Sequence, residues 1–312
     1  MSAVAILHPT GLPGKELRET IEARHPDWDL RLLSTREDEI GTLTEIAGAA
    51  ALVGRFEPES LEGVPVAFFC GAMAGNRPLL AELPAGTTAI VLSYDATVED
   101  GLPIVAGVNT EAIGAGRVLL SPHPAAVLLA HLLHPLRELA PEEAVATVIQ
   151  PASMRDDAGL EELFEQTRQI VAMTRRTPTP VFGAQLAFNL LPVPLPADAV
   201  AAQLRSVLGG PPPPALQILQ GAVFHSVSAS LYVRCAGEPS LQAFRKALAG
   251  HPFLEPADKP RHLGPIDAAA SDKVLYGAVR KDEAGGGFWL WAVTDNLTRG
   301  GALNALEIAE AI

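Results

Sequence analysis

Short apolar runs alternate with polar, turn-rich stretches along the first part of the chain. Such runs, bounded by Gly, Pro and Asp, are typical of strands buried on both faces. Helical spacing of apolar residues between them, as in 77–83, favours an alternation of strands and helices around a parallel sheet. The strands predicted here are 4–7, 28–33, 49–53, 64–69, 88–92 and 118–120.

From about residue 144 the predicted strands lengthen, which is typical of an antiparallel sheet. Residues 160–174 carry apolar side chains at helical spacing and predict an amphipathic helix. The chain closes on 296–312, where Leu303, Leu306 and Ile308 predict a last helix. The strands predicted in this half are 144–150, 216–225, 231–236, 274–280 and 288–293.

The length of 312 residues and a hydrophobic content of 48% are ample for two domains with separate cores. A formal net charge of −13 without a long basic block makes nucleic acid an unexpected partner. No membrane partner is expected either, because Pro, Gly or His interrupts every apolar run well short of a membrane span, and no signal-peptide pattern opens the chain.

Cysteine and histidine usage predicts no metal site. The two cysteines, Cys70 and Cys235, lie far apart in apolar runs, which argues against a disulfide framework or zinc and favours a reducing cytoplasm. His131 and His134 have no third ligand near them, so we interpret them as surface or interface histidines. We therefore expect a cytoplasmic protein without a bound metal.

A glycine turn follows the first predicted strand and contains Thr10, Gly11 and Gly14. Strand, glycine turn and helix open a dinucleotide-binding unit, in which backbone N–H groups face a pyrophosphate. His8 stands in the place of the first glycine, and Pro13 removes one backbone donor. A tight turn in a fold that binds no nucleotide is therefore an equally good interpretation.

Ser34, Thr35 and Arg36 follow the second predicted strand, about 20 residues beyond the glycines, where dinucleotide folds contact the adenosine ribose. An acid at this place selects NAD, whereas a Ser-Thr-Arg sequence suits the 2′-phosphate of NADP. Acidic residues come directly after Arg36, so a solvated loop charge is the alternative interpretation.

The sequence Ser-Pro-His-Pro at 121–124 precedes an apolar helix. A helix N-terminus exposes unpaired N–H groups and suits a thiolate or a bound anion. Pro124 is well suited to a first helical turn but has no nucleophilic atom. We interpret Ser121 as an N-terminal cap and His123 as a turn residue.

Several further motifs follow one another in a recognisable order. They are the glycine turn after 4–7, the segment 103–109, Gln150 in Val-Ile-Gln-Pro-Ala-Ser, Ala-Phe-Asn-Leu-Leu-Pro at 187–192, Asp-Asn-Leu at 295–297 and Gly-Gly-Ala-Leu at 300–303. Together they resemble aspartate-semialdehyde dehydrogenases, collinearly over nearly the whole chain. The similarity is greatest to the Usg-type homologues of that family, which lack the catalytic cysteine.

The resemblance implies an α/β fold of two domains. A Rossmann-like, parallel-sheet dinucleotide-binding domain would comprise 1–121 and 296–312. An α+β dimerisation domain with a mostly antiparallel sheet would comprise 122–295. In the family this second domain pairs with its twin across a two-fold axis, so a homodimer is expected.

The resemblance also implies a reaction, the reversible NADPH-dependent reduction of aspartyl phosphate through a cysteine thioester. It places Pro124 at the nucleophile, where no sulfur is available. His225, in Val-Phe-His-Ser, would be the general acid/base, and Gln150 would remain from the family's catalytic site. Asn296 is implied as a cofactor contact.

The groups that would hold the anionic substrate are missing in the same alignment. The arginine for the substrate carboxylate falls on Ile218, and the phosphate-binding arginine falls near Thr97. The acid and lysine of a nearby helix become Gln203 and Ser206, which leaves Arg205 as the cation there. The sequence therefore predicts no aspartate-semialdehyde dehydrogenase activity.

The leading hypothesis is an aspartate-semialdehyde dehydrogenase-like protein that has lost the thioester chemistry and binds NADP or NAD weakly or not at all. One alternative is an active NAD(P)-dependent oxidoreductase on a small carbonyl substrate, with His225 as acid/base and direct hydride transfer. A second is a dimeric interaction module. The expected partner is a second copy of the chain, and a small-molecule ligand stays open.

Overall fold

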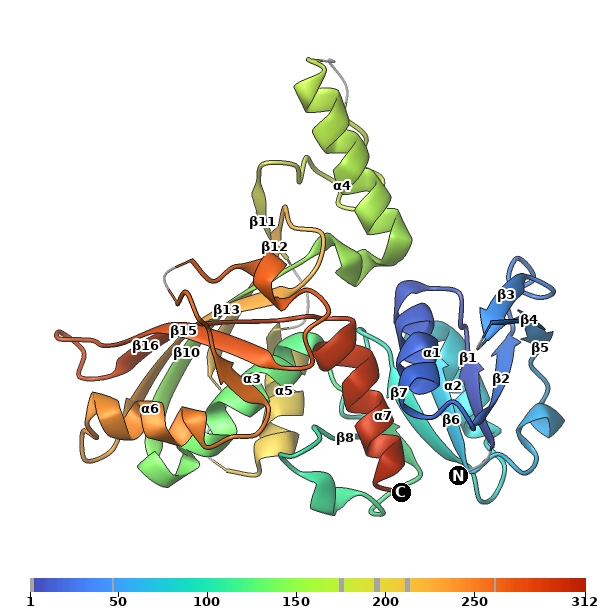
Figure 1. The fold of residues 1–312 in the computed structure, drawn as a ribbon, viewed down its shortest axis with the longest axis horizontal. Coiled ribbons are helices and arrows are strands. Elements are labelled where there is room, and N and C mark those ends of the chain that lie inside the picture. Colours follow the sequence, from blue (N-terminus) through green and yellow to red (C-terminus); the bar gives the residue numbers. More distant parts are fainter. Residues whose placement is uncertain (1–2, 47, 174–176, 194–196, 211–213, 261) are drawn as a thin grey trace. The chain divides into compact units, whose positions relative to one another are not determined.

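The computed structural model describes residues 3–46, 48–173, 177–193, 197–210, 214–260 and 262–312 (Figure 1). The chain forms two compact units. Unit 1 comprises Met1–His123 and Gly300–Ile312, and unit 2 comprises Pro124–Arg299. The expected domain breaks, 121/122 and 295/296, differ from these unit boundaries by two and four residues.

Unit 1 is built on a seven-stranded sheet with the order β5-β2-β1-β6-β7-β9-β8, in which every pair is parallel. The strand order reverses between β1 and β6, and in open α/β sheets ligands bind at such a switch point. The strands are β1 (Ala3–Leu7), β2 (Asp29–Ser34), β5 (Gly54–Arg55), β6 (Val66–Cys70), β7 (Thr88–Leu92), β8 (Leu102–Pro103) and β9 (Val118–Leu120).

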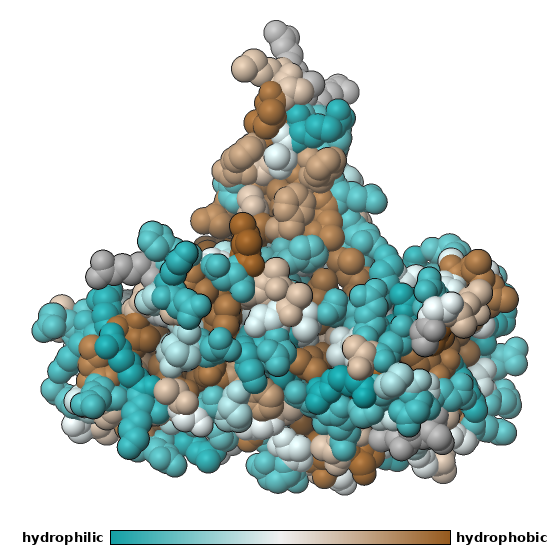
Figure 2. Space-filling model, in the orientation of Figure 1, coloured by the Kyte–Doolittle hydropathy of each residue, from teal (hydrophilic) through white to brown (hydrophobic). Residues whose placement is uncertain are grey.

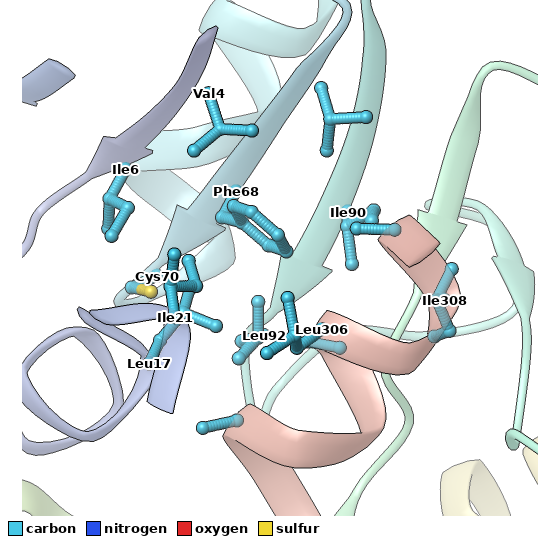
Figure 3. Packing of buried hydrophobic residues seen from close by; sticks show 14 of the residues in the cluster. Val4, Ile6, Leu17, Ile21, Phe68, Cys70, Ile90, Leu92, Leu306 and Ile308 are labelled. Carbon is cyan, nitrogen blue, oxygen red and sulfur yellow. The ribbon is translucent and has the colours of Figure 1, made fainter. Parts of the chain in front are cut away.

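Helices cover both faces of this sheet, so successive side chains of its central strands are all buried. Ile6 belongs to the cluster under α1 (Leu12–Arg24) and α7 (Leu303–Glu310), which Figure 3 shows. Leu7 belongs to the opposite cluster, under α2 (Met73–Ala81) and the short helix η1 (Pro58–Leu61). The predicted parallel, doubly covered sheet is confirmed.

The predicted strand 49–53 is not part of this sheet, and that expectation was wrong. β4 (Ala49–Leu52) pairs antiparallel with β3 (Leu43–Ile46) in a separate hairpin, and three of the four β4 residues are exposed. Three of its side chains are alanine, which bring too little apolar surface to require burial. The edge beside β2 is taken by β5 instead.

Unit 2 contains a second seven-stranded sheet, with the order β11-β12-β10-β13-β16-β15-β14. It is mixed, because β10 pairs parallel with β12 and β14 with β15, while the other pairs are antiparallel. The strands are β10 (Pro141–Gln150), β11 (Leu190–Pro192), β12 (Ala215–Gly221), β13 (Val227–Cys235), β14 (Leu254–Pro256), β15 (Val274–Lys281) and β16 (Phe288–Thr294). The predicted strand 216–225 ends early, so His225 lies in the loop before β13.

Three helices pack on one face of this sheet (Figure 1): α3 (Pro124–Leu133), α5 (Ala197–Leu208) and α6 (Leu241–Ala249). Buried residues of β10, β13 and β16 point toward them and alternate with half-buried or exposed residues that point to the other side. We call that other side the open face. Its apolar side chains include Val145, Ile149, Tyr232, Trp289 and Trp291.

The predicted helix 160–174 is α4 (Asp156–Val171); Thr174 lies outside the described residues. We call α4, β11 and the described residues between them the α4 lobe. Large exposed apolar side chains gather on this lobe (Figure 2), among them Phe164, Val171 and Phe188. The short helices η4 (Ala152–Arg155) and η3 (His134–Leu139) precede α4, and η5 (Pro265–Ala268) precedes β15.

Candidate functional site

The first turn after β1 keeps the shape of a dinucleotide-binding turn. His8 has a φ of 56°, the left-handed region that glycine favours. A Cβ on Gly14 would lie 2.7 Å from the carbonyl oxygen of His8, so only glycine allows α1 to approach this closely. Gly11 is the N-cap of α1, and Thr10 is half-buried before it. His8 stands where dinucleotide-binding turns have a glycine, and the turn keeps its left-handed backbone conformation although a side chain is present.

The ring of His8 lies in a buried polar network at the end of β2. Its Nδ1 is 3.1 Å from Ser34 Oγ, and the Ser34 hydroxyl donates to Glu39 Oε2 at 2.6 Å. Ser34 Oγ also accepts from the backbone N–H of Arg36 at 3.0 Å. Burial lowers the pKa of His8, and the neighbouring Glu39 carboxylate opposes that shift. Ser34 is fully buried, so its hydroxyl forms hydrogen bonds within the protein and does not face solvent.

The Arg36 guanidinium is held by two carboxylates. Nη2 and Nε donate to Asp38 at 2.7 and 3.3 Å, and Nη1 lies 3.2 Å from Glu39 Oε1. Thr35, between Ser34 and Arg36, is exposed. Glu39 is a site residue that the sequence interpretation missed; it was visible only as one member of the acidic run after Arg36.

Carboxylates of the chain also bind the start of α2 and the loop between β7 and β8. Both oxygens of Asp95 accept from the backbone N–H of Met73, at 3.0 and 3.2 Å, in the first turn of α2. Asp100 accepts from the N–H and hydroxyl of Thr97 and binds Arg77 through both oxygens, at 2.6 and 3.1 Å. The anion-binding groups of this edge are therefore paired internally.

Pro124 is the first residue of α3, and it is buried. Ser121 Oγ accepts from Asn304 Nδ2 at 2.9 Å and donates to the Gly301 carbonyl at 3.4 Å. Its hydroxyl therefore joins segments of unit 1 instead of capping α3, which corrects the sequence interpretation. His123 lies edge-on to Tyr94, and burial lowers its pKa to about 4, so the ring is neutral.

The loop that carries His225 is anchored by the Asn296 amide. Asn296 Oδ1 accepts from the backbone N–H of Ser226 at 2.9 Å, and its Nδ2 donates to Ser153 Oγ at 3.0 Å. Ser153 N–H in turn donates to the Phe224 carbonyl. Ser226 has a φ of 74°, so the loop is held in a conformation that non-glycine residues rarely adopt. His225 is half-buried and projects from this fixed turn.

Gln150 is tied to a residue that the sequence interpretation did not single out. The two residues are in register on the parallel strands β10 and β12, and Gln150 Nε2 donates to Gln220 Oε1 at 3.0 Å. Gln220 Nε2 donates back to the Gln150 carbonyl at 3.1 Å. Ile218 lies two residues earlier on the same buried side of β12. On α5, Gln203 is buried, whereas Arg205 is exposed.

The interpretation of His131 as a surface or interface histidine was wrong. The described helix α3 is buried on every side, and His131 is fully enclosed in unit 2, 5.1 Å from the ring centroids of both His251 and Phe253. An all-apolar helix is buried all round, and its lone histidine is buried with it.

Cys70 and Cys235 are buried free thiols at the ends of β6 and β13. Burial raises the pKa of the Cys235 thiol. Among the described residues, no group of three or more His, Cys, Asp or Glu side chains is placed to hold a metal ion. Within the same residues, no helix has the length and apolar character to cross a membrane.

Comparisons with known proteins give a consistent family. Residues 133–299 match the family model described as semialdehyde dehydrogenase, dimerisation domain. The USG-1 protein homolog of Azotobacter vinelandii is 30% identical over 331 residues, which cover 99% of this chain and 97% of the relative. Aspartate-semialdehyde dehydrogenase of Bacillus subtilis (strain 168) is 25% identical over 337 residues, covering 99% and 96%.

A solved structure, that of a probable aspartate-semialdehyde dehydrogenase from Pseudomonas aeruginosa, has a TM-score of 0.91 at 26% identity and covers 99% of this chain and 97% of that chain. The family model spans more than half of the chain, and the relative at 30% identity spans nearly all of it. The chain therefore belongs to the semialdehyde dehydrogenase family, together with the aspartate-semialdehyde dehydrogenases and the USG-1 homologues.

Proposed function

We propose that this protein is a semialdehyde dehydrogenase homologue that does not carry out thioester chemistry. Pro124, at the first position of α3, is the observation on which the proposal rests. A thioester needs a thiolate at that position, and proline has no nucleophilic atom. The two thiols of the chain are buried at the ends of β6 and β13.

The charges expected around the substrate support the same conclusion. Recognition of a carboxylate and a phosphate calls for accessible cations, arginine above all. Ile218, at the expected place of the carboxylate-binding arginine, is part of the core of unit 2. Thr97, near the expected place of the phosphate-binding arginine, carries no charge and donates to Asp100. Acyl transfer requires the nucleophile and both anion-binding groups in one geometry, so their joint loss removes the reaction.

A dinucleotide is the ligand that the turn of unit 1 fits best, and we expect it to bind weakly. The close approach at Gly14 and the left-handed turn at His8 retain the backbone shape that faces a pyrophosphate, with Thr10 and Gly11 beside it. Pro13 lacks one N–H donor, and the His8 side chain narrows the turn. A nicotinamide dinucleotide bound here would supply hydride transfer, and the turn after β1 would hold its pyrophosphate.

A homodimer formed by unit 2 is the second part of the proposal. The matched model is a dimerisation domain and spans most of unit 2. The open face presents the exposed side chain of Val145 and the half-buried side chains of Ile149, Tyr232, Trp289 and Trp291. An apolar patch of this kind marks an interaction site on a soluble domain.

An activity assay tests the first part. Purified protein is mixed with aspartate semialdehyde, phosphate and either NADP or NAD, and the absorbance of the reduced cofactor is followed beside the Bacillus subtilis enzyme as positive control. We expect no turnover above the uncatalysed rate. Pro124→Cys is expected to stay inactive, because it restores the sulfur but neither anion-binding group.

Turnover by the unaltered chain that disappears in His225→Ala would contradict the proposal. It would favour direct hydride transfer on a small carbonyl substrate, with His225 as acid/base on its fixed loop. Activity in Pro124→Cys alone would show that the anion-binding groups are still present.

A further inference from the structure

The end of β2 determines which dinucleotide unit 1 admits, and this question rests on the proposed dinucleotide site. In this fold the adenosine ribose lies beside the residues that follow β2. NADP carries a phosphate on the ribose 2′-oxygen, and NAD carries a hydroxyl there. A 2′-phosphate needs an uncommitted cation, whereas a hydroxyl needs a carboxylate oxygen as acceptor.

The cations at this place are already neutralised. Arg36 is engaged by both oxygens of Asp38 and by Glu39. Arg55, on the neighbouring strand β5, donates through both terminal nitrogens to Glu37, at 2.7 and 2.9 Å. Three carboxylates therefore face two guanidinium groups, which leaves a local net negative charge.

The Ser34 hydroxyl, a neutral donor at this place, is also engaged within the protein. The hydroxyl of Ser34 donates to Glu39, whose side chain is only 5% exposed. The pKa of His8 is lowered by burial, so its ring adds no positive charge near neutral pH. By contrast, the Asp38 side chain is 68% exposed and keeps carboxylate lone pairs directed to solvent.

We infer that unit 1 discriminates against NADP and takes an adenine dinucleotide with a free 2′-hydroxyl. Asp38 is the acceptor for that hydroxyl, and Glu39 holds Arg36 and Ser34 away from a 2′-phosphate. In the Ser-Thr-Arg sequence that suggested NADP, the Ser34 hydroxyl and the Arg36 guanidinium are therefore bound to the acids that follow them. The specificity-determining residues are Asp38 and Glu39.

Isothermal calorimetry of the full chain with NADH and with NADPH tests this directly. We expect NADH to bind at least about tenfold more tightly, because a doubly charged phosphate is repelled by the local carboxylates. The fragment 5′-ADP, which lacks the 2′-phosphate, is expected to bind more tightly than 2′,5′-ADP, which carries it. Asp38→Asn should weaken the binding of NADH and strengthen that of NADPH, so the ratio of the two affinities should fall. The double variant Asp38→Asn with Glu39→Gln should lower this ratio further.

Glu165→Gln is the matched control. It removes one carboxylate bound to an arginine, Arg168, on the surface of unit 2, so the net charge changes equally without altering the end of β2. The ratio of its affinities for NADH and NADPH should equal that of the unaltered chain. Asp38→Asn changes an exposed side chain, so circular dichroism should show an intact fold even where Glu39→Gln perturbs the buried network.

The outcomes distinguish a failure of this inference from a failure of the proposed dinucleotide site. Equal or tighter binding of NADPH by the unaltered chain overturns the inference and leaves the dinucleotide site standing. An unchanged ratio in the double variant, folded by circular dichroism, removes Asp38 and Glu39 as its cause. Absence of binding by either cofactor at millimolar concentration overturns the proposed dinucleotide site, and the inference with it.

Discussion

His131 and His251 show, at the scale of single residues, how burial changes the chemistry of a side chain. Burial lowers the pKa of His131 well below its ordinary value, and the Arg299 guanidinium, His251 and His134 add to the shift. Burial likewise lowers the pKa of His251 to about 4, with His134 and Arg299 contributing. Arg299 lies over the ring of Phe253, which completes the cluster in unit 2. Both imidazoles are therefore neutral at neutral pH.

This cluster predicts an acid-sensitive unit 2. Because the folded pKa lies below that of the unfolded chain, the unfolded state binds the proton first, so the free energy of unfolding falls as the pH drops from about 6.5 to about 4. For His251 alone the loss is about 3 kcal/mol over that range. Urea unfolding at pH 7.5, 6 and 5 measures it.

His131→Leu should flatten the dependence of unfolding on pH, since it removes one buried titrating ring. His262→Gln is the control, because His262 is exposed. An equally steep pH dependence in His131→Leu and in the unaltered chain would contradict the assignment.

At the scale of elements, the α4 lobe is stabilised by polar side chains of one helix. Glu162 accepts from the backbone N–H groups of Val181 and Phe182, at 2.5 and 3.2 Å. One turn later, Gln166 Oε1 accepts from Leu186 and Ala187 N–H, at 2.7 and 2.9 Å. The buried carboxylate of Glu162 and the buried amide of Gln166 hold the segment 178–187 on α4 beside a small apolar cluster. The helix therefore fixes a loop that the apolar contacts alone would hold poorly.

Gln166→Ala should release that segment. Two buried N–H groups lose their acceptor, which costs about 2–4 kcal/mol locally. Hydrogen exchange at residues 186 and 187 is expected to speed up at least about tenfold. Glu165→Ala on the same helix breaks an exposed pair with Arg168 and a hydrogen bond from Gln169, neither of which involves the segment 178–187, and should leave this exchange unchanged. Equal exchange in the two variants would show that the apolar cluster holds the segment by itself.

At the scale of the whole molecule, the two units hold different parts of the family's machinery. Unit 1 carries the glycine turn and the polar network at the end of β2, whereas unit 2 carries Pro124, the Gln150–Gln220 pair and the loop of His225. The proposed dimer depends on the open face of unit 2, which is less apolar than a core but has two tryptophans.

Charges placed on the open face should dissociate the dimer. Val145→Asp with Ile149→Asp changes one exposed and one half-buried side chain of β10 on that face, and light scattering coupled to size exclusion should then report a monomer. Leu43→Asp, in the exposed β3 of unit 1, places a charge on a more exposed apolar residue and should remain dimeric. A monomeric unaltered chain, or a dimer that tolerates the double change, would contradict the proposal.

The sequence by itself determined the parallel, doubly covered sheet of unit 1, the mainly antiparallel second sheet and the absence of a thiol at Pro124. Runs such as 4–7 carry large branched side chains that are stable only when buried, and a proline has no nucleophile in any fold. The run 49–53 begins with three alanines, which bury too little apolar surface to fix the position of the strand, so hydrophobicity did not predict where it pairs.

Only the tertiary structure decided which polar groups remain available to a ligand. Ser34 and Arg36 read as phosphate-binding donors, yet the fold brings Glu39 and Asp38 onto them. Gln150 meets Gln220 because β10 and β12 are parallel and in register, and His131 is enclosed because every side of α3 is covered. The acids that engage Ser34 and Arg36 are close in sequence, but the conformation of the turn decides which acid reaches which donor. The Gln150–Gln220 pair and the burial of His131 depend on residues that are distant in the chain, and a linear pattern carries no record of such neighbours.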